Sequence, residues 1–132
     1  MTHRRSGEHR DLVAPSPAPS PRPEPGLIAI LPESRPAIAA AVEAAGGTVA
    51  PLSAETRGVI WLSNSESAEF VATLEANPQI GWVQLPWAGV DRFAGTLKHF
   101  STKPSPIWTS AKGSYSEPVA EHALALTLAI LR

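Results

Sequence analysis

Apolar runs of strand length alternate with amphipathic stretches from residue 26 to residue 109. Five such runs are predicted as β-strands, at residues 27–31, 48–52, 58–62, 80–85 and 107–109. The first of them, LIAIL, is apolar without interruption, which is typical of a strand that is covered on both faces of a sheet. The pattern therefore predicts strands buried in a sheet that has helices on its faces.

Two amphipathic stretches lie between these runs and are predicted as helices. The first is expected to be capped by Ser34, to have Pro36 in its first turn and to end at Gly46-Gly47. The second opens with Ser63-Asn64-Ser65-Glu66, the pattern of a capping box, and ends at Asn77-Pro78. Strands that alternate with helices imply right-handed crossovers and a parallel sheet, which places the chain in the α/β class.

One connection conflicts with this scheme. Residues 53–57 are far fewer than the dozen or so residues that usually join parallel strands. Either the strand at 48–52 is short and the link is stretched, or one of the two strand assignments is wrong.

The C-terminal stretch, residues 116–132, is predicted as a helix that is apolar on nearly every side. From Pro118 onward only Glu121, His122 and Thr127 interrupt the apolar residues. A helix of this kind needs burial on more than one side, yet the run is shorter than the roughly twenty apolar residues of a membrane span. We expect that the sequence is truncated before the element that covers this helix, although an ordinary buried C-terminal helix remains the alternative.

Two sequence blocks resemble one known family. The first is KGSY followed by SEPVAEHALALTLAILR at 112–132, and the second is WVQLPWAGVD at 82–91. Together they resemble the NAD-dependent D-isomer-specific 2-hydroxyacid dehydrogenases, in which the first block is the helix that leaves the substrate domain and the second is a strand with its substrate loop. The resemblance extends over residues 27–132.

The resemblance implies a domain organisation. Residues 27–115 would form a flavodoxin-like substrate domain, with a parallel sheet and flanking helices, and residues 116–132 an interdomain helix leading to a dinucleotide-binding domain. In the family, the glycine-rich turn for NAD or NADP and the catalytic Arg, Glu and His come after this helix, so no catalytic residue and no cofactor are expected in this chain alone. A complete relative is expected to be a homodimer in the cytoplasm that acts on a small 2-oxo or 2-hydroxy acid.

Candidate substrate-binding residues follow the predicted strands. Ligands of open parallel sheets bind beyond the carboxyl ends of the strands, where residues 32–34, Ser63-Asn64 and residues 87–89 would meet. The small residues Ala88 and Gly89 would let two backbone N–H groups approach a substrate carboxylate, as in an anion-binding nest. The alternative is that Gly89 only makes a turn.

Other residues receive narrower roles. Ser63, Asn64 and Trp87 would shape specificity, although Trp87 equally suits a place in the core, and Asp91 is expected to cap a helix. The resemblance implies that Tyr115 reaches the substrate and that Ser116 and Val119 lie near the nicotinamide. The adjacent Glu121 and His122 point about 100° apart on a helix, so we expect them to hold the helix to the domain rather than to act as an acid/base pair.

Composition excludes several other functions. The net charge is −1, which gives no basis for binding nucleic acid or an anionic membrane. Without cysteine there is no disulfide or thiolate metal site, and four scattered histidines lack ligand spacing, so no metal is expected. Residues 1–26 are basic and then proline-rich, without the apolar stretch of a secretory signal, and are expected to be disordered. A polyproline II ligand is the other possibility for this segment.

Two functions remain open at this point. The chain is either the substrate domain of an oxidoreductase, inactive by itself, or a stand-alone flavodoxin-like binding or regulatory module. The apolar circumference of the C-terminal helix favours the first, because a stand-alone module would place polar residues on its outward face.

Overall fold

The computed structural model describes residues 22–64 and 67–130. Its elements are, in chain order, β1 (Leu27–Leu31), α1 (Pro36–Ala44), β2 (Thr56–Trp61), α2 (Ala68–Ala76), β3 (Trp82–Gln84), the 3-10 turn η1 (Asp91–Phe93), α3 (Ala94–Phe100), β4 (Ile107–Thr109) and α4 (Ser116–Ile130). The expected disorder of the N-terminal segment falls mostly on residues 1–21, outside the described residues, as do Ser65 and Glu66 of the expected capping box.

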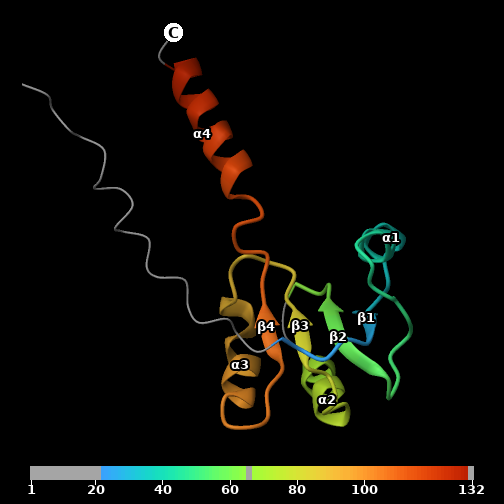
Figure 1. The fold of residues 1–132 in the computed structure, drawn as a ribbon. Helices are drawn as coiled ribbons and strands as arrows, with labels where there is room; N and C mark the ends of the chain where they lie inside the picture. Colours follow the sequence, from blue (N-terminus) through green and yellow to red (C-terminus); the bar gives the residue numbers. More distant parts are fainter. Residues whose placement is uncertain (1–21, 65–66, 131–132) are drawn as a thin grey trace, which may run out of the picture.

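The four strands form one parallel sheet in the order β1-β2-β3-β4 (Figure 1). In register, Val83 of the third strand lies between Val59 on one side and Trp108 on the other. All four carboxyl ends therefore lie at the same edge of the sheet. The prediction of an α/β fold with a parallel sheet and flanking helices is confirmed.

The predicted strand at residues 48–52 is wrong, because only Val49 pairs with the sheet. Val49 makes a single parallel bridge to Ile28 on the free edge of β1, and the bonds on either side of it are Ile28 N–H to Thr48 O (2.9 Å) and Ala50 N–H to Ile28 O (3.0 Å). Pro51 follows and has no N–H, so it cannot donate to a ladder. The apolar run TVAPL thus has the composition of a strand but cannot pair over its length.

The single bridge also accounts for the short connection at 53–57. Val49 lies beside Ile28, and Thr56 lies beside Leu27 on the other side of the same strand. The link therefore passes from one side of β1 to the other at nearly the same level, and it does not have to travel back along a strand.

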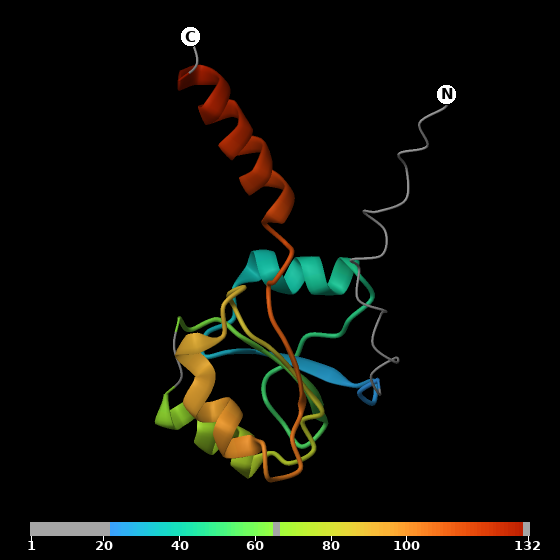
Figure 2. The same cartoon turned by 90° about the vertical axis from the view of Figure 1, so that its left-hand side faces the viewer.

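The position of Val49 on the outer side of β1 determines which face of the sheet each helix covers. The chain steps outward from β1 to Val49 through α1, whereas it steps the opposite way through α2 and α3. Right-handed crossovers in opposite directions place their helices on opposite faces, and Figure 2 shows α1 on one side of the sheet with α2 and α3 on the other. The arrangement is that of a flavodoxin-like sheet.

The core lies between the sheet and the pair α2 and α3. Trp61 stacks on Phe70 of α2 with ring centroids 4.4 Å apart, and Phe93 contacts Phe70 edge to face. The buried cluster consists of Ala29, Val59, Trp61, Phe70, Leu74, Ile80, Val83, Leu85, Phe93 and Phe100. Helix α1 has no buried residue, so the opposite face of the sheet is covered less completely.

Three predicted helix caps differ from the structure. Arg35, not Ser34, is the N-cap of α1 and makes no side-chain cap bond, although Pro36 does begin that helix. Ser67 caps α2 by accepting a hydrogen bond from the Phe70 N–H at 3.1 Å. It takes the place predicted for Ser63, since α2 begins at Ala68. Asp91 makes no cap bond and lies inside η1, after Val90.

Helix α4 projects from the carboxyl edge of the sheet (Figures 1 and 2). None of its described residues is buried. Within the described ranges 22–64 and 67–130, no helix is long and apolar enough to cross a lipid bilayer.

Candidate carboxylate-binding site

Two hollows lie at the carboxyl ends of the first three strands. The first, which we call the β3 hollow, has a volume of about 370 Å³ and is lined by Asn64, Trp87, Gly89, Asp91 and Arg92. The second, the β1–β2 hollow, has a volume of about 350 Å³ and is lined by Pro32, Glu33, Arg35, Leu62, Ser63 and Asn64. Because Asn64 lines both, the two hollows are neighbours. The structure thus brings Asn64, Trp87 and Gly89 together.

The loop that carries Ala88 and Gly89 is held at both ends. On one side, the Leu85 N–H donates to Thr109 O (2.8 Å) and the Ala111 N–H donates to Trp87 O (3.1 Å), so the chain after β4 fixes the start of the loop. On the other side, the loop leads into the buried Phe93. Ala88 and Gly89 are exposed between these anchors. Among the described residues, their N–H groups have no hydrogen-bond acceptor.

Gly89 does not take a conformation that requires glycine. The glycines with positive φ in the described part of the chain are Gly46 and Gly113, and Gly89 is not one of them. A Cβ atom at Gly89 would meet only Asp91 Oδ2, at an ordinary contact distance of 3.5 Å. Neither the turn nor the surrounding packing therefore demands glycine here. The αR–αL form of an anion-binding nest is also absent from residues 88–89.

Trp87 does not belong to the core. Its side chain is 47 % exposed, so of the two interpretations from sequence, packing in the core is wrong. Trp87 forms an apolar wall of the β3 hollow, and Asn64 forms a polar one. Ser63 lies in the neighbouring hollow rather than beside Gly89.

Among the described residues, each hollow is lined by one acidic residue and one arginine. Asp91 and Arg92 belong to the β3 hollow, and Glu33 and Arg35 to the β1–β2 hollow. Neither arginine makes an ion pair or a hydrogen bond to another described residue. The sequence analysis did not select these arginines. The one available signal was that Arg92 directly follows the loop motif and its aspartate.

Tyr115, which was predicted to reach the substrate, and the two residues predicted near the nicotinamide do not line either hollow. Tyr115 precedes α4, and Ser116 and Val119 belong to its first turns; all three are exposed and none lines either hollow. Glu121 and His122 are exposed and bond to no other described residue. The prediction that they hold the helix to the domain is therefore wrong.

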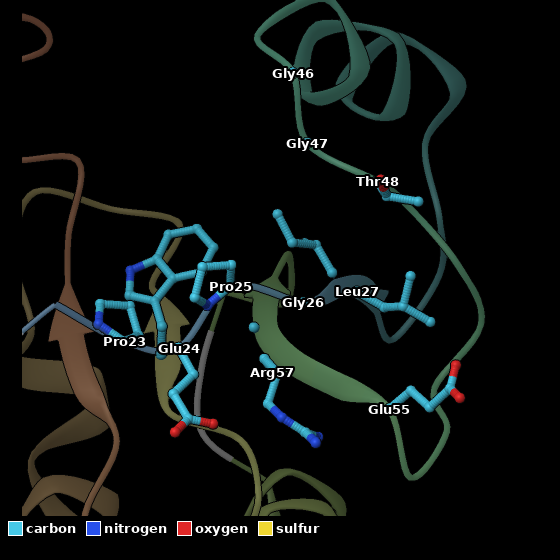
Figure 3. Close-up of a pocket in the computed structure, with 13 residues that line it drawn as sticks. Pro23, Glu24, Pro25, Gly26, Leu27, Gly46, Gly47, Thr48, Glu55 and Arg57 are labelled. Carbon is cyan, nitrogen blue, oxygen red and sulfur yellow. The ribbon is translucent and has the colours of Figure 1, made fainter.

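A larger hollow lies at the opposite, amino end of the strands. Its volume is about 590 Å³, and residues 23–26, Gly58 and Trp82 contribute to its lining. Figure 3 shows Glu24, Glu55 and Arg57 along one side of this hollow and Gly46, Gly47 and Thr48 along the other.

Arg57, the one cation among the described residues of this larger hollow, already binds backbone carbonyl groups. Arg57 Nη1 donates to the carbonyl oxygens of Ala54 (2.9 Å) and Thr56 (3.2 Å). The hollow is therefore less suited to an anionic ligand than the loop that carries Gly89. Among the described residues, no group of three or more His, Asp or Glu side chains could hold a metal ion.

Comparisons of the chain with protein-family models, with curated proteins and with solved structures found no match.

Proposed function

We propose that residues 27–115 form the substrate-binding domain of an oxidoreductase that interconverts 2-hydroxy and 2-oxo acids with NAD or NADP. The substrate carboxylate would be bound by the backbone N–H groups of Ala88 and Gly89. The observation that carries this proposal is Gly89 itself. It lines a hollow and has an N–H without an acceptor among the described residues, and neither φ nor packing explains why it is glycine. Close approach of a ligand to the backbone does explain it.

The hollow suits a small acid. Its volume of about 370 Å³ is near the lower end of the range of about 300–1,000 Å³ that is usual for ligand pockets. A carboxylate accepts strong, charge-assisted hydrogen bonds from backbone N–H groups. Trp87 and Asn64 would then contact the rest of the substrate, while Ser63 would meet only a substrate long enough to enter the β1–β2 hollow.

Helix α4 would lead from this domain to a cofactor domain. Its exposed apolar residues need a cover, which a second domain and the second subunit of a homodimer would supply. Ser116 and Val119 are exposed at its amino end, so a nicotinamide ring could approach them. The bound cofactor would supply hydride transfer to the substrate carbonyl carbon. The residues of this chain would hold the carboxylate in place for that step. We expect the complete enzyme to be cytoplasmic.

The binding claim can be tested on the 132-residue chain alone. Pyruvate, glyoxylate and hydroxypyruvate are titrated into ¹⁵N-labelled protein, and the amide signals of Ala88 and Gly89 are expected to shift. Gly89→Ala should weaken binding about tenfold, the effect of a lost charge-assisted hydrogen bond, because the new methyl group would keep the carboxylate from the amides.

Gly81→Ala is the matched control. A Cβ at Gly81 would meet Pro23 Cβ at 3.6 Å, so it is accommodated as easily as one at Gly89, but Gly81 does not line the β3 hollow. This variant should bind like the unaltered chain. If Gly89→Ala binds all three acids as well as Gly81→Ala does, Gly89 is only part of a turn, and the proposal is wrong.

A further inference from the structure

We infer that the β3 hollow is selective for a 2-oxo acid with a second anionic group, and that the guanidinium of Arg92 binds that group. The inference rests on the proposed function, since it assigns the second end of a substrate whose first carboxylate is held at Ala88 and Gly89. Arg92 is then the residue that determines specificity, and the substrate is a 2-oxo dicarboxylate.

The lining of the β3 hollow is the first argument. Apart from Trp87, the described part of this lining consists of the polar side chains of Asn64, Asp91 and Arg92 and the backbone at Gly89. A hydrocarbon tail on the substrate would find a single apolar wall, and it would desolvate three polar groups without replacing their hydrogen bonds. A polar or charged tail avoids that loss.

The charged residues of the lining indicate which charge the distal group of the substrate should carry. Asp91 and Arg92 are neighbours in sequence, yet they form no ion pair. Arg92 is the cation of this hollow, and it has no acceptor among the described residues. Guanidinium groups bind carboxylates in a bidentate manner, so an anionic tail would complete the site.

A pair of ligands of nearly equal size separates this inference from simple carboxylate binding. The probes are 2-oxoglutarate and its 5-methyl ester, which differ in the charge of the distal group. Affinities are measured by ¹⁵N titration of the 132-residue chain, with the Ala88 and Gly89 signals as the readout. We expect 2-oxoglutarate to bind about two- to fivefold more tightly, the range for a solvent-exposed ion pair. In about 1 M salt, where the Debye length is about 3 Å, this preference should shrink.

Two arginine variants locate the preference. Arg92→Gln should abolish the difference between the two ligands and leave the affinity for the 5-methyl ester nearly unchanged. Arg35→Gln is the control, because it removes the same charge from the neighbouring β1–β2 hollow and should preserve the preference. If Arg92→Gln does not fold, Arg92→Lys serves instead and should retain part of the preference, since it keeps the charge but not the bidentate geometry.

The outcomes distinguish this inference from the proposed function. If the unaltered and Arg92→Gln chains show the same preference for 2-oxoglutarate, the inference is wrong. It is also wrong if Arg92→Gln lowers the affinity for both ligands equally, since Arg92 would then bind the carboxylate that the two ligands share. In both cases carboxylate binding at Gly89 would stand. If neither ligand shifts the Ala88 and Gly89 signals, the proposed function itself fails.

Discussion

Helix α4 should make the isolated chain associate with itself. Its apolar side chains are largely exposed: Val119 is 63 % exposed, Leu124 61 %, Leu126 52 %, Leu128 56 % and Ile130 84 %. One helix–helix contact buries a single face of α4 on each of the two chains, and thus about five such side chains in all. Complete burial of one of them contributes about 1.5–3 kcal/mol, so burial of the exposed half or more contributes roughly 1–1.5 kcal/mol each and about 5–8 kcal/mol for the five.

Association also has a cost. The loss of translational and rotational freedom requires at least about 4 kcal/mol, which leaves up to about 4 kcal/mol in favour of a complex. That corresponds to a dissociation constant of about 1 mM. We therefore expect a weak, concentration-dependent association that becomes visible at high micromolar to millimolar protein, and not a tight dimer.

The assay is sedimentation equilibrium over a series of protein concentrations. Replacing Leu124, Leu126 and Leu128 with Gln should give a monomer at every concentration, because the apolar area available for contact is removed while Gln remains a good helix former. Replacing Glu121 and Thr127 of the same helix with Gln is the control and should leave association unchanged. A clean monomer for the unaltered chain near 1 mM would refute this reasoning, since α4 would then have found burial within its own domain.

Three further results are expected. Ser67→Ala should lower the free energy of unfolding by about 1 kcal/mol in a urea titration, whereas Ser63→Ala should have little effect, because Ser67 makes the cap bond. The pKa of Glu75 is lowered by its hydrogen bonds to Lys103 and then to His99, so the stabilisation is present above the unfolded-state pKa and is lost as the pH falls through the lower folded-state pKa. Urea titrations should therefore show Lys103→Gln less stable than the unaltered chain at pH 7 and equally stable at strongly acidic pH. Finally, the chain alone should not oxidise NADH in the presence of glyoxylate, pyruvate or hydroxypyruvate, because the proposed function assigns proton transfer and cofactor binding to a separate cofactor domain; turnover that survives repurification would contradict this.

Local pattern was sufficient for most of the fold. The strands at 27–31 and 107–109 match the prediction residue for residue, because continuous apolar runs of this length suit a covered sheet. The run at 48–52 failed because strand pairing needs N–H donors as well as apolar side chains, and Pro51 supplies none. The cap of α2 was assigned to the wrong serine, because Ser63 and Ser67 both precede the helix and both have side chains that can cap it.

The candidate site was predictable only in part. The rule that ligands bind at the carboxyl ends of parallel strands selected residues 32–34, Ser63-Asn64 and residues 87–89. Asn64, Trp87 and Gly89 line the β3 hollow, Ser63 lines the neighbouring hollow, and Ala88 lines neither. Arg92 was missed because a single exposed arginine looks the same in sequence whether it faces a hollow or open solvent. The exposure of Trp87 likewise depends on how the loop is anchored by Ala111, a contact between segments that no local pattern encodes.

The most direct test of the central claim is a crystal structure of the chain grown with oxamate, a non-reacting analogue of pyruvate. The account predicts its carboxylate in the β3 hollow, with one or both oxygens within about 2.7–3.2 Å of the backbone nitrogens of Ala88 and Gly89. Oxamate in the hollow between residues 23–26 and Trp82 at the other end of the sheet, with the loop at Gly89 empty, would contradict it.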